Sequence, residues 1–422
     1  MIQITIRIAV LLVLCLSTNA LFMLGSTYQS SGGSPLEKMH PSLYVVVLGL
    51  SLVLLASRGG GFRTRLQGMA GPTSLMIFGA AAITVWAILS PNAGGEISAP
   101  IVTFLLPALL LLLLQWSSIS TLKFVSSFLH IFFVLNSLAG LFAYLTGFNL
   151  LENTAGAMVV RDPRPTGLLG HPLINAQMTG AWVLYLVLGG IKRGFKGQTL
   201  VQASLHSLAL VAFGGRSALA FVVVILFAYS MYRAYHGVVT GKSKSIFNLM
   251  VLGLIALAVV AFSIQAGITE VLFDRLNDDR GSADTRIAAL QMLGILDLGQ
   301  WFVGVGPSQR NAMLLYLNTP VGIESFPIAI LVNYGLPAML LITGTSFYAL
   351  FKLAAPLKGV GAWLVIYFFV SSAASLSLGS KTTSMSIFVL VLVAFRQLAI
   401  DDRVDAVVGA ADAPSTRAVT PA

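Results

Sequence analysis

The amino-acid sequence predicts an all-α integral membrane protein that crosses its bilayer about twelve times. Hydrophobic residues make up 57% of the 422 residues and charged residues only 9%, whereas a soluble domain carries about a quarter charged residues. Runs such as Ile101–Leu114, Leu210–Tyr229 and Leu249–Ile264 have the length that a hydrocarbon core of about 30 Å requires. The runs are continuously apolar rather than alternating, which favours transmembrane helices over a β-barrel.

Twelve predicted spans follow one another, at about 4–24, 43–56, 74–90, 100–116, 122–147, 172–191, 199–213, 217–234, 246–266, 326–350, 361–379 and 382–399. The first run carries one basic residue, Arg7, and further spans follow it, so we interpret it as an uncleaved span. Little polar sequence separates the spans, which predicts one transmembrane domain over residues 1–400. Residues 401–422, rich in Ala, Asp, Thr and Pro, are predicted to form a disordered cytoplasmic tail.

The charges between the spans give this topology a direction. With the N-terminus inside, 16 of the 25 basic residues fall in inner segments and 11 of the 15 acidic residues fall in outer segments. This distribution follows the positive-inside rule and predicts that both termini are cytoplasmic. The net charge of +10 is therefore attributed to membrane topology and not to nucleic-acid binding.

Two outer segments stand apart by their length, at about 148–171 and 267–325. Long connections in a compact protein are usually functional or disordered. The second contains a stretch with apolar residues at near-helical spacing, which opens at Asp284, a predicted N-cap. We expect an amphipathic helix in the outer membrane interface, with an apolar stripe formed by Ile287, Leu290, Leu293 and Leu296.

Seven of the nine basic residues on the predicted outer face are arginines, the side chain that grips phosphate or carboxylate with a planar fork. Pairing with nearby aspartates is the favoured explanation for Arg275, Arg280 and Arg310. Arg216 has no acid nearby in sequence and stands at the mouth of a span, where it either snorkels or faces a polar cavity. Arg286 lies in the first turn of the amphipathic stretch, where a cation opposes the helix dipole, which suggests an anionic partner.

Glu324 stands just before Phe326–Leu331, where the long outer loop re-enters the membrane. A carboxylate at this boundary suits a general base or acid, and a solvated carboxylate at a span end is the alternative. His171, at the outer end of the sixth span, is a candidate ligand for sugar or phosphate. His130 and His206 fall near mid-membrane and are interpreted as helix–helix hydrogen-bonding residues. Since no His, Cys or Asp set has metal-ligand spacing, neither a metal nor another cofactor is predicted.

Several short motifs occur in a fixed order between about 160 and 340. They read Arg-Pro-Thr-Gly-Leu-Leu-Gly-His-Pro-Leu at 164–173, Gly-Gly-Arg-Ser-Ala at 214–218, Ser-Ala-Asp-Thr-Arg at 282–286, Val-Gly-Val-Gly-Pro at 303–307, Glu-Ser-Phe-Pro-Ile at 324–328 and Asn-Tyr-Gly-Leu-Pro at 333–337. Together with the long outer loop, this order resembles the O-antigen polymerase and ligase superfamily of bacterial envelope proteins. Outside this region only the pattern of spans matches.

The resemblance implies a metal-independent glycosyltransferase at the periplasmic face, whose donor is a glycan on undecaprenyl pyrophosphate. Two family arginines that engage the pyrophosphate match Arg216 and Arg286. Ligases begin the re-entering segment with His-Asn, whereas this chain has Glu324-Ser325, which is similar to the polymerase branch and makes Glu324 the candidate catalytic base. The further candidates for substrate binding are Arg161, Arg164, His171 and Arg310.

The sequence thus predicts a polymerase of the Wzy type that extends O-antigen or exopolysaccharide chains in the bacterial inner membrane. Two alternatives stay open. One is a ligase that transfers glycan to lipid A-core or protein, and the other is a transporter or flippase of an anionic substrate, which would place its ionisable residues near the midplane. The expected partners are the lipid-linked glycan donor, a glycan acceptor, membrane lipids and a chain-length regulator, with no nucleic acid.

Overall fold

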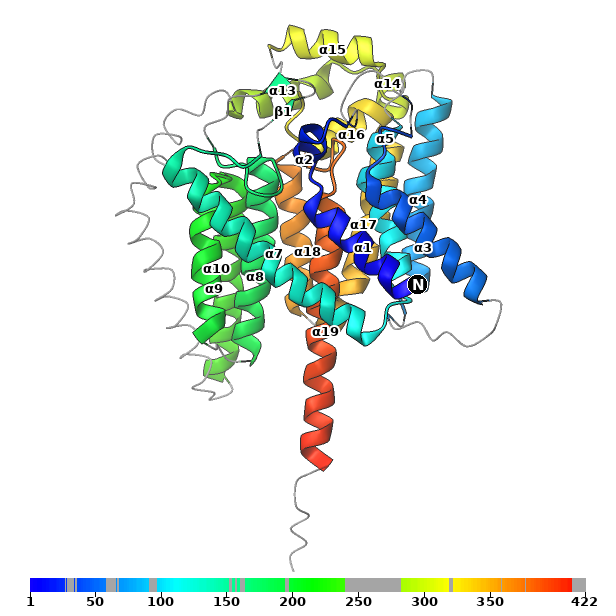
Figure 1. Ribbon diagram of the computed structural model, residues 1–422. Coiled ribbons are helices and arrows are strands. Elements are labelled where there is room, and N and C mark those ends of the chain that lie inside the picture. The colour runs from blue at the N-terminus through cyan, green and yellow to red at the C-terminus, as the bar shows by residue number, and fades with distance from the viewer. Residues whose placement is uncertain are drawn as a thin grey trace, which may run out of the picture.

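The described part of the protein is a bundle of helices with a layer of shorter helices over one end (Figure 1). The structure is a computed structural model that describes residues 1–26, 28, 34, 36–57, 66, 68–90, 97–151, 154–155, 158–159, 164–193, 197–239, 282–318, 322–357, 359–375 and 377–411. Within these residues the strands are limited to a two-residue antiparallel pair, β1 (Thr154–Ala155) and β2 (Met158–Val159). The predicted ninth span, 246–266, lies outside the described residues.

The helices follow the predicted runs in order. They are α1 (Ile2–Cys15), α2 (Thr18–Met23), α3 (Pro41–Ser57), α4 (Ala70–Leu89), α5 (Ser98–Pro100), the π-helix η2 (Ile101–Leu105), α6 (Leu106–Leu114), α7 (Ile119–Thr146), α8 (Pro172–Arg193), α9 (Gly197–Ala212), α10 (Arg216–Val239), α13 (Ser282–Ile295), α14 (Leu298–Val303), α15 (Pro307–Tyr316), α16 (Phe326–Tyr334), α17 (Leu336–Ala354), the 3-10 helix η3 (Ala355–Leu357), α18 (Gly359–Ala373) and α19 (Ser384–Ala411).

Five helices, α4, α7, α8, α10 and α17, are long and apolar enough to cross a membrane. Five shorter apolar helices accompany them: α1, α3, the continuous run from α5 to α6, α18, and α19 as far as Gln397. The predicted seventh span forms α9, which is in neither group. The chain is therefore a helical membrane protein, and the number of twelve crossings stays a prediction.

The predicted first span is broken into α1 and α2, contrary to the expectation of one continuous helix. Ser17 is extended and caps α2 by accepting a hydrogen bond from the backbone N–H of Ala20 at 3.2 Å. The Leu16 carbonyl accepts a hydrogen bond from His40 Nε2 at 2.7 Å. The break is tolerated inside the protein because a side chain from another segment satisfies the freed carbonyl.

The predicted tenth span, 326–350, is also two helices, α16 and α17. The break falls at Gly335, whose φ of 86° favours glycine. A Cβ atom there would lie 2.1 Å from the carbonyl oxygen of Phe302 at the end of α14. A side chain at this position would displace α14, so glycine fixes both the break and the contact.

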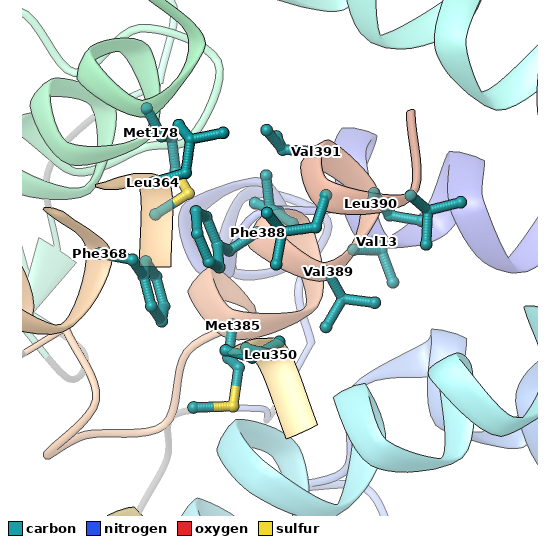
Figure 2. Close-up of a cluster of buried hydrophobic side chains, with 14 of the residues drawn as sticks. Val13, Met178, Leu350, Leu364, Phe368, Met385, Phe388, Val389, Leu390 and Val391 are labelled. Atoms are coloured by element: carbon teal, nitrogen blue, oxygen red, sulfur yellow. The ribbon is translucent and has the colours of Figure 1, made fainter. Parts of the chain in front are cut away.

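The core is centred on α19, in which the consecutive side chains from Met385 to Ala394 are buried. A helix that is apolar all round is buried on every side. Figure 2 shows Phe388 and its neighbours packed against Phe368 of α18, Leu350 of α17 and Val13 of α1. The rings of Phe368 and Phe388 stack with centroids 4.1 Å apart. The helix continues through Ala411, whereas the disordered tail was expected from Asp401.

Helices α13, α14 and α15 lie over the end of the bundle at which α16 begins (Figure 1). The predicted helix is present as α13, but it begins at Ser282, so Asp284 lies within its first turn and is not its N-cap. Its place in the outer membrane interface stays a prediction. The predicted apolar stripe is partly wrong, because Ile287 and Leu290 are exposed. The buried side is formed instead by Ala288, Ala289, Met292 and Leu296, since small side chains allow α13 to approach α16 closely.

Candidate functional site

The segment 164–171, which precedes α8, is held by asparagine side chains, of which Asn19, Asn136 and Asn175 are buried and Asn149 is half-buried. Asn149 Oδ1 accepts a hydrogen bond from the backbone N–H of Thr166 at 2.9 Å. Asn136 Oδ1, on α7, accepts one from the backbone N–H of Leu168 at 2.8 Å. Polar groups of irregular backbone inside a membrane protein require such partners.

Two further asparagines bind the carbonyl groups of the same segment. The side-chain amide of Asn175 donates to the carbonyls of Thr166 and His171. The amide of Asn19, on α2, donates to the carbonyl of Gly170. The backbone from Thr166 to His171 is therefore held by side chains from α2, α7 and α8.

Arg216 is the first residue of α10 and is half-buried. The connection from α9 is a tight turn, in which Gly214 has a φ of 68° and its carbonyl accepts from the backbone N–H of Arg216 at 3.1 Å. Gly215 lies against Ala176 of α8, because a Cβ at Gly215 would come within 2.3 Å of the Ala176 Cβ. We call residues 214–216 the arginine turn.

Glu324 is half-buried and lies two residues before α16. Ser325 is extended, and the backbone N–H of Phe326 donates to the carbonyl of Ser375 at 3.1 Å. The Phe326 ring lies 6.4 Å from the ring of Phe369 on α18, centroid to centroid. The start of α16, and with it Glu324, is therefore attached to the end of α18.

Sequence reasoning missed the loop between α18 and α19. Thr103 of the π-helix donates through Oγ1 to the carbonyl of Ser380 at 2.7 Å and accepts from the backbone N–H of Thr382 at 3.1 Å. Ser375 Oγ donates to Ser377 Oγ at 2.9 Å. A dense run of hydroxyl residues between two apolar spans, from 371 to 386, was the available signal.

The same loop reaches the segment that precedes α3. Lys381 Nζ donates to the carbonyls of Tyr28 and Lys38 and lies 3.8 Å from the centroid of the Tyr28 ring. His40 is buried beside them, with Nδ1 2.6 Å from Ser42 Oγ. Burial, with a smaller effect of the Lys381 charge, lowers the pKa of His40 to about 4, so the imidazole is neutral near pH 7.

The remaining sequence candidates lie on α13 and α15 or outside the described residues. Arg286 is exposed on α13, which packs against α16. Arg310 of α15 donates to Asn333 Oδ1 of α16 at 2.9 Å. This contact ties α15 to α16. The aspartate pairing predicted for Arg310 stays a prediction, and Arg275 and Arg280 lie outside the described residues. Arg161 lies outside the described residues.

These contacts bring Arg164, His171, Arg216 and Glu324 to one end of the bundle, with Arg286 on a helix that packs on α16. Ser137 Oγ lies 2.7 Å from His206 Nδ1, so His206 bonds α9 to α7, as interpreted from the sequence. His130 contacts the edge of the Trp182 ring, with centroids 4.9 Å apart. In the described ranges no three His, Cys, Asp or Glu side chains are grouped to hold a metal ion.

Fold and site define a helical membrane protein with a polar, cation-bearing end. A scan against models of known protein families gave no match. A search of curated proteins gave no match either.

Proposed function

We propose that this protein is a polymerase of the Wzy type, which joins undecaprenyl-pyrophosphate-linked oligosaccharide repeats at the periplasmic face. The observation that supports the proposal is the attachment of two elements to the same pair of helices. The arginine turn packs on α8 at Ala176, the start of α16 bonds to the end of α18 at Ser375, and α8 packs against α18. A cation and a carboxylate thus stand on segments attached to the same end of one packed helix pair.

The proposed step needs both groups. A hydroxyl oxygen of the acceptor glycan attacks the anomeric carbon of the donor, the bond from that carbon to the pyrophosphate oxygen breaks, and the hydroxyl proton passes to Glu324. Arg216 and Arg286 stabilise the negative charge that grows on the leaving pyrophosphate, an electrostatic effect that is commonly the largest in such reactions. The donor arrives already activated by its lipid pyrophosphate, so the step uses no nucleotide.

Deletion of the gene, followed by complementation with variants, tests this function. A polymerase deletion leaves single glycan repeats on the cell surface and removes long chains. Arg216→Ala and Arg286→Ala should then fail to restore long chains, with losses of about 10²–10³-fold expected for a lost charge-stabilising donor. Lys123→Ala, which removes an exposed cation from α7, is the control and should restore them.

The other outcomes of the deletion identify the alternatives. Loss of all surface glycan, with long chains retained on the lipid carrier, would indicate a ligase. Accumulation of glycan repeats inside the cell would indicate a transporter or flippase. Near-normal chain lengths in both arginine variants would exclude the pyrophosphate role of these residues.

A further inference from the structure

Gln177, near the start of α8, makes a buried polar contact with α18. Its side chain is 2% exposed. The amide nitrogen lies within hydrogen-bonding distance of three acceptors, which share its two N–H groups: the carbonyl of Phe368 at 3.2 Å, Ser371 Oγ at 3.1 Å and Ser372 Oγ. A buried amide is costly unless it is hydrogen-bonded, so this set of acceptors holds the end of α18 at one height along α8.

Further hydrogen bonds connect this part of α18 to the start of α16. The backbone N–H of Ser375 donates to the carbonyl of Ser372 at 2.9 Å. The carbonyl of Ser375 in turn accepts from the backbone N–H of Phe326 at 3.1 Å. We call this path from Gln177 through Ser372 and Ser375 to Phe326 the serine relay. It ends two residues from Glu324.

The other side of the same turn of α8 touches the arginine turn. Ala176, the residue before Gln177, contacts Gly215, and Gly215 directly precedes Arg216. One turn of α8 therefore contacts the segment that carries the candidate cation and, through the serine relay, the segment that carries the candidate base.

We propose that Gln177 is a positioning residue that sets the placement of Glu324 relative to Arg216. The role in catalysis rests on the proposed polymerase function, whereas the placement itself does not. A catalytic group displaced by about 1 Å can lose about 10²-fold in rate. A second hydrogen bond at this helix pair, from Tyr367 Oη to the carbonyl of Gln177 at 3.0 Å, holds α8 to α18 without involving Ser372 or Ser375.

Three variants separate positioning from helix packing. Gln177→Leu keeps a similar volume and removes the side-chain hydrogen bonds with which the serine relay begins. Tyr367→Phe removes one equally buried hydrogen bond between the same two helices. Gln115→Leu removes a buried hydrogen bond from Gln115 Nε2 to Thr73 Oγ1, 2.9 Å long, which joins the end of α6 to α4.

The first measurement is a distance that does not depend on activity. Cys15 is the only cysteine, so Cys15→Ser provides a cysteine-free background for nitroxide labels at Ser217→Cys and Ser325→Cys. Pulsed electron paramagnetic resonance should give one narrow distance distribution in this background, in Tyr367→Phe and in Gln115→Leu. Gln177→Leu should broaden or shift it. An unchanged distribution in folded Gln177→Leu would overturn the proposal.

The second measurement is the rate of glycan chain extension by unlabelled protein in membranes. Gln177→Leu should lower kcat by about 10- to 100-fold with little change in KM, and the two control variants should stay near wild type. Equal losses in Gln177→Leu and Tyr367→Phe would overturn the positioning role. If the proposed function is wrong, neither wild type nor any variant extends glycans. The distance measurement then still decides whether the serine relay sets the placement of Glu324 relative to Arg216.

Discussion

Gly215 lies in direct contact with Ala176, so that a Cβ atom on the glycine would come within 2.3 Å of the Cβ atom of the alanine. Small residues at such contacts let two membrane helices approach closely. This contact sets where α10 begins, and α10 begins with Arg216. A packing constraint at the neighbouring glycine therefore contributes to the position of the arginine.

Gly215→Val should therefore lower glycan chain extension although it changes no charged residue. The two added methyl groups and the Cβ cannot be accommodated against Ala176, so α10 must shift at the arginine turn. We expect shorter chains on a glycan gel and a lower melting temperature in detergent. Gly344→Ala is the matched control, because Gly344 lies in α17 and a Cβ atom there would meet no neighbouring element within 4 Å. Normal chain length in Gly215→Val would contradict the packing argument.

The helices themselves could be predicted from the sequence because continuous apolar runs have few alternatives in a bilayer. The breaks between α1 and α2 and between α16 and α17 could not be predicted from the sequence. The end of α1 depends on His40, which bonds the Leu16 carbonyl from 24 positions away. The break at Gly335 depends on the carbonyl of Phe302. In both cases the partner lies in a separate element, so local patterns carry no signal for it.

The candidate site was predicted in part. Arg216 and Glu324 stand out because they are charged residues beside apolar runs, and short motifs surround them. Gln177 does not stand out, since the residues around a single amide in an apolar span do not indicate its hydrogen-bond partners. Its partners Ser371 and Ser372 are 194 and 195 positions away. Polar networks between spans of this kind depend on helix packing, which the sequence of each span does not specify.

His40 should make the stability of the protein depend on pH. Its pKa is lowered to about 4 by burial, below the usual value of about 6.5, so the unfolded state binds the proton more readily. The stabilising contribution is complete above about pH 6.5 and is lost as the pH falls through 4. We expect the melting temperature in detergent to fall between pH 7 and pH 4.5.

His40→Gln provides the comparison, because its amide can still donate to the Leu16 carbonyl but does not titrate. The melting temperature of the variant should fall less than that of wild type over the same pH range. Identical pH profiles for the two proteins would show that His40 is not responsible. Lys381 is the charged side chain that also disfavours the imidazolium.

Glu324→Gln should abolish chain extension at every pH at which wild type is active. Glutamine keeps the size and hydrogen-bonding capacity of the side chain but cannot take a proton from the acceptor hydroxyl, a contribution of about 10²–10⁴-fold. The rate of chain extension in membranes, measured across a pH range, checks this. Glu37→Gln, in the segment before α3, should behave as wild type. A Glu324→Gln protein with wild-type rates would exclude proton transfer by this residue.

The direction of the bundle in the membrane can be tested at its two ends. α10 runs from Arg216 to Val239, a length of about 36 Å at 1.5 Å per residue, which is enough to cross the bilayer. α14 lies over the end of the bundle at which α16 begins (Figure 1), the end to which the arginine turn also belongs. An alkaline phosphatase fusion after residue 300 should therefore be active, because the enzyme folds only in the periplasm, and a fusion after residue 240 should be inactive. Green fluorescent protein at the same two sites should give the reciprocal pattern, and a reversed result would place Arg216 and Glu324 on the cytoplasmic side, away from the proposed donor.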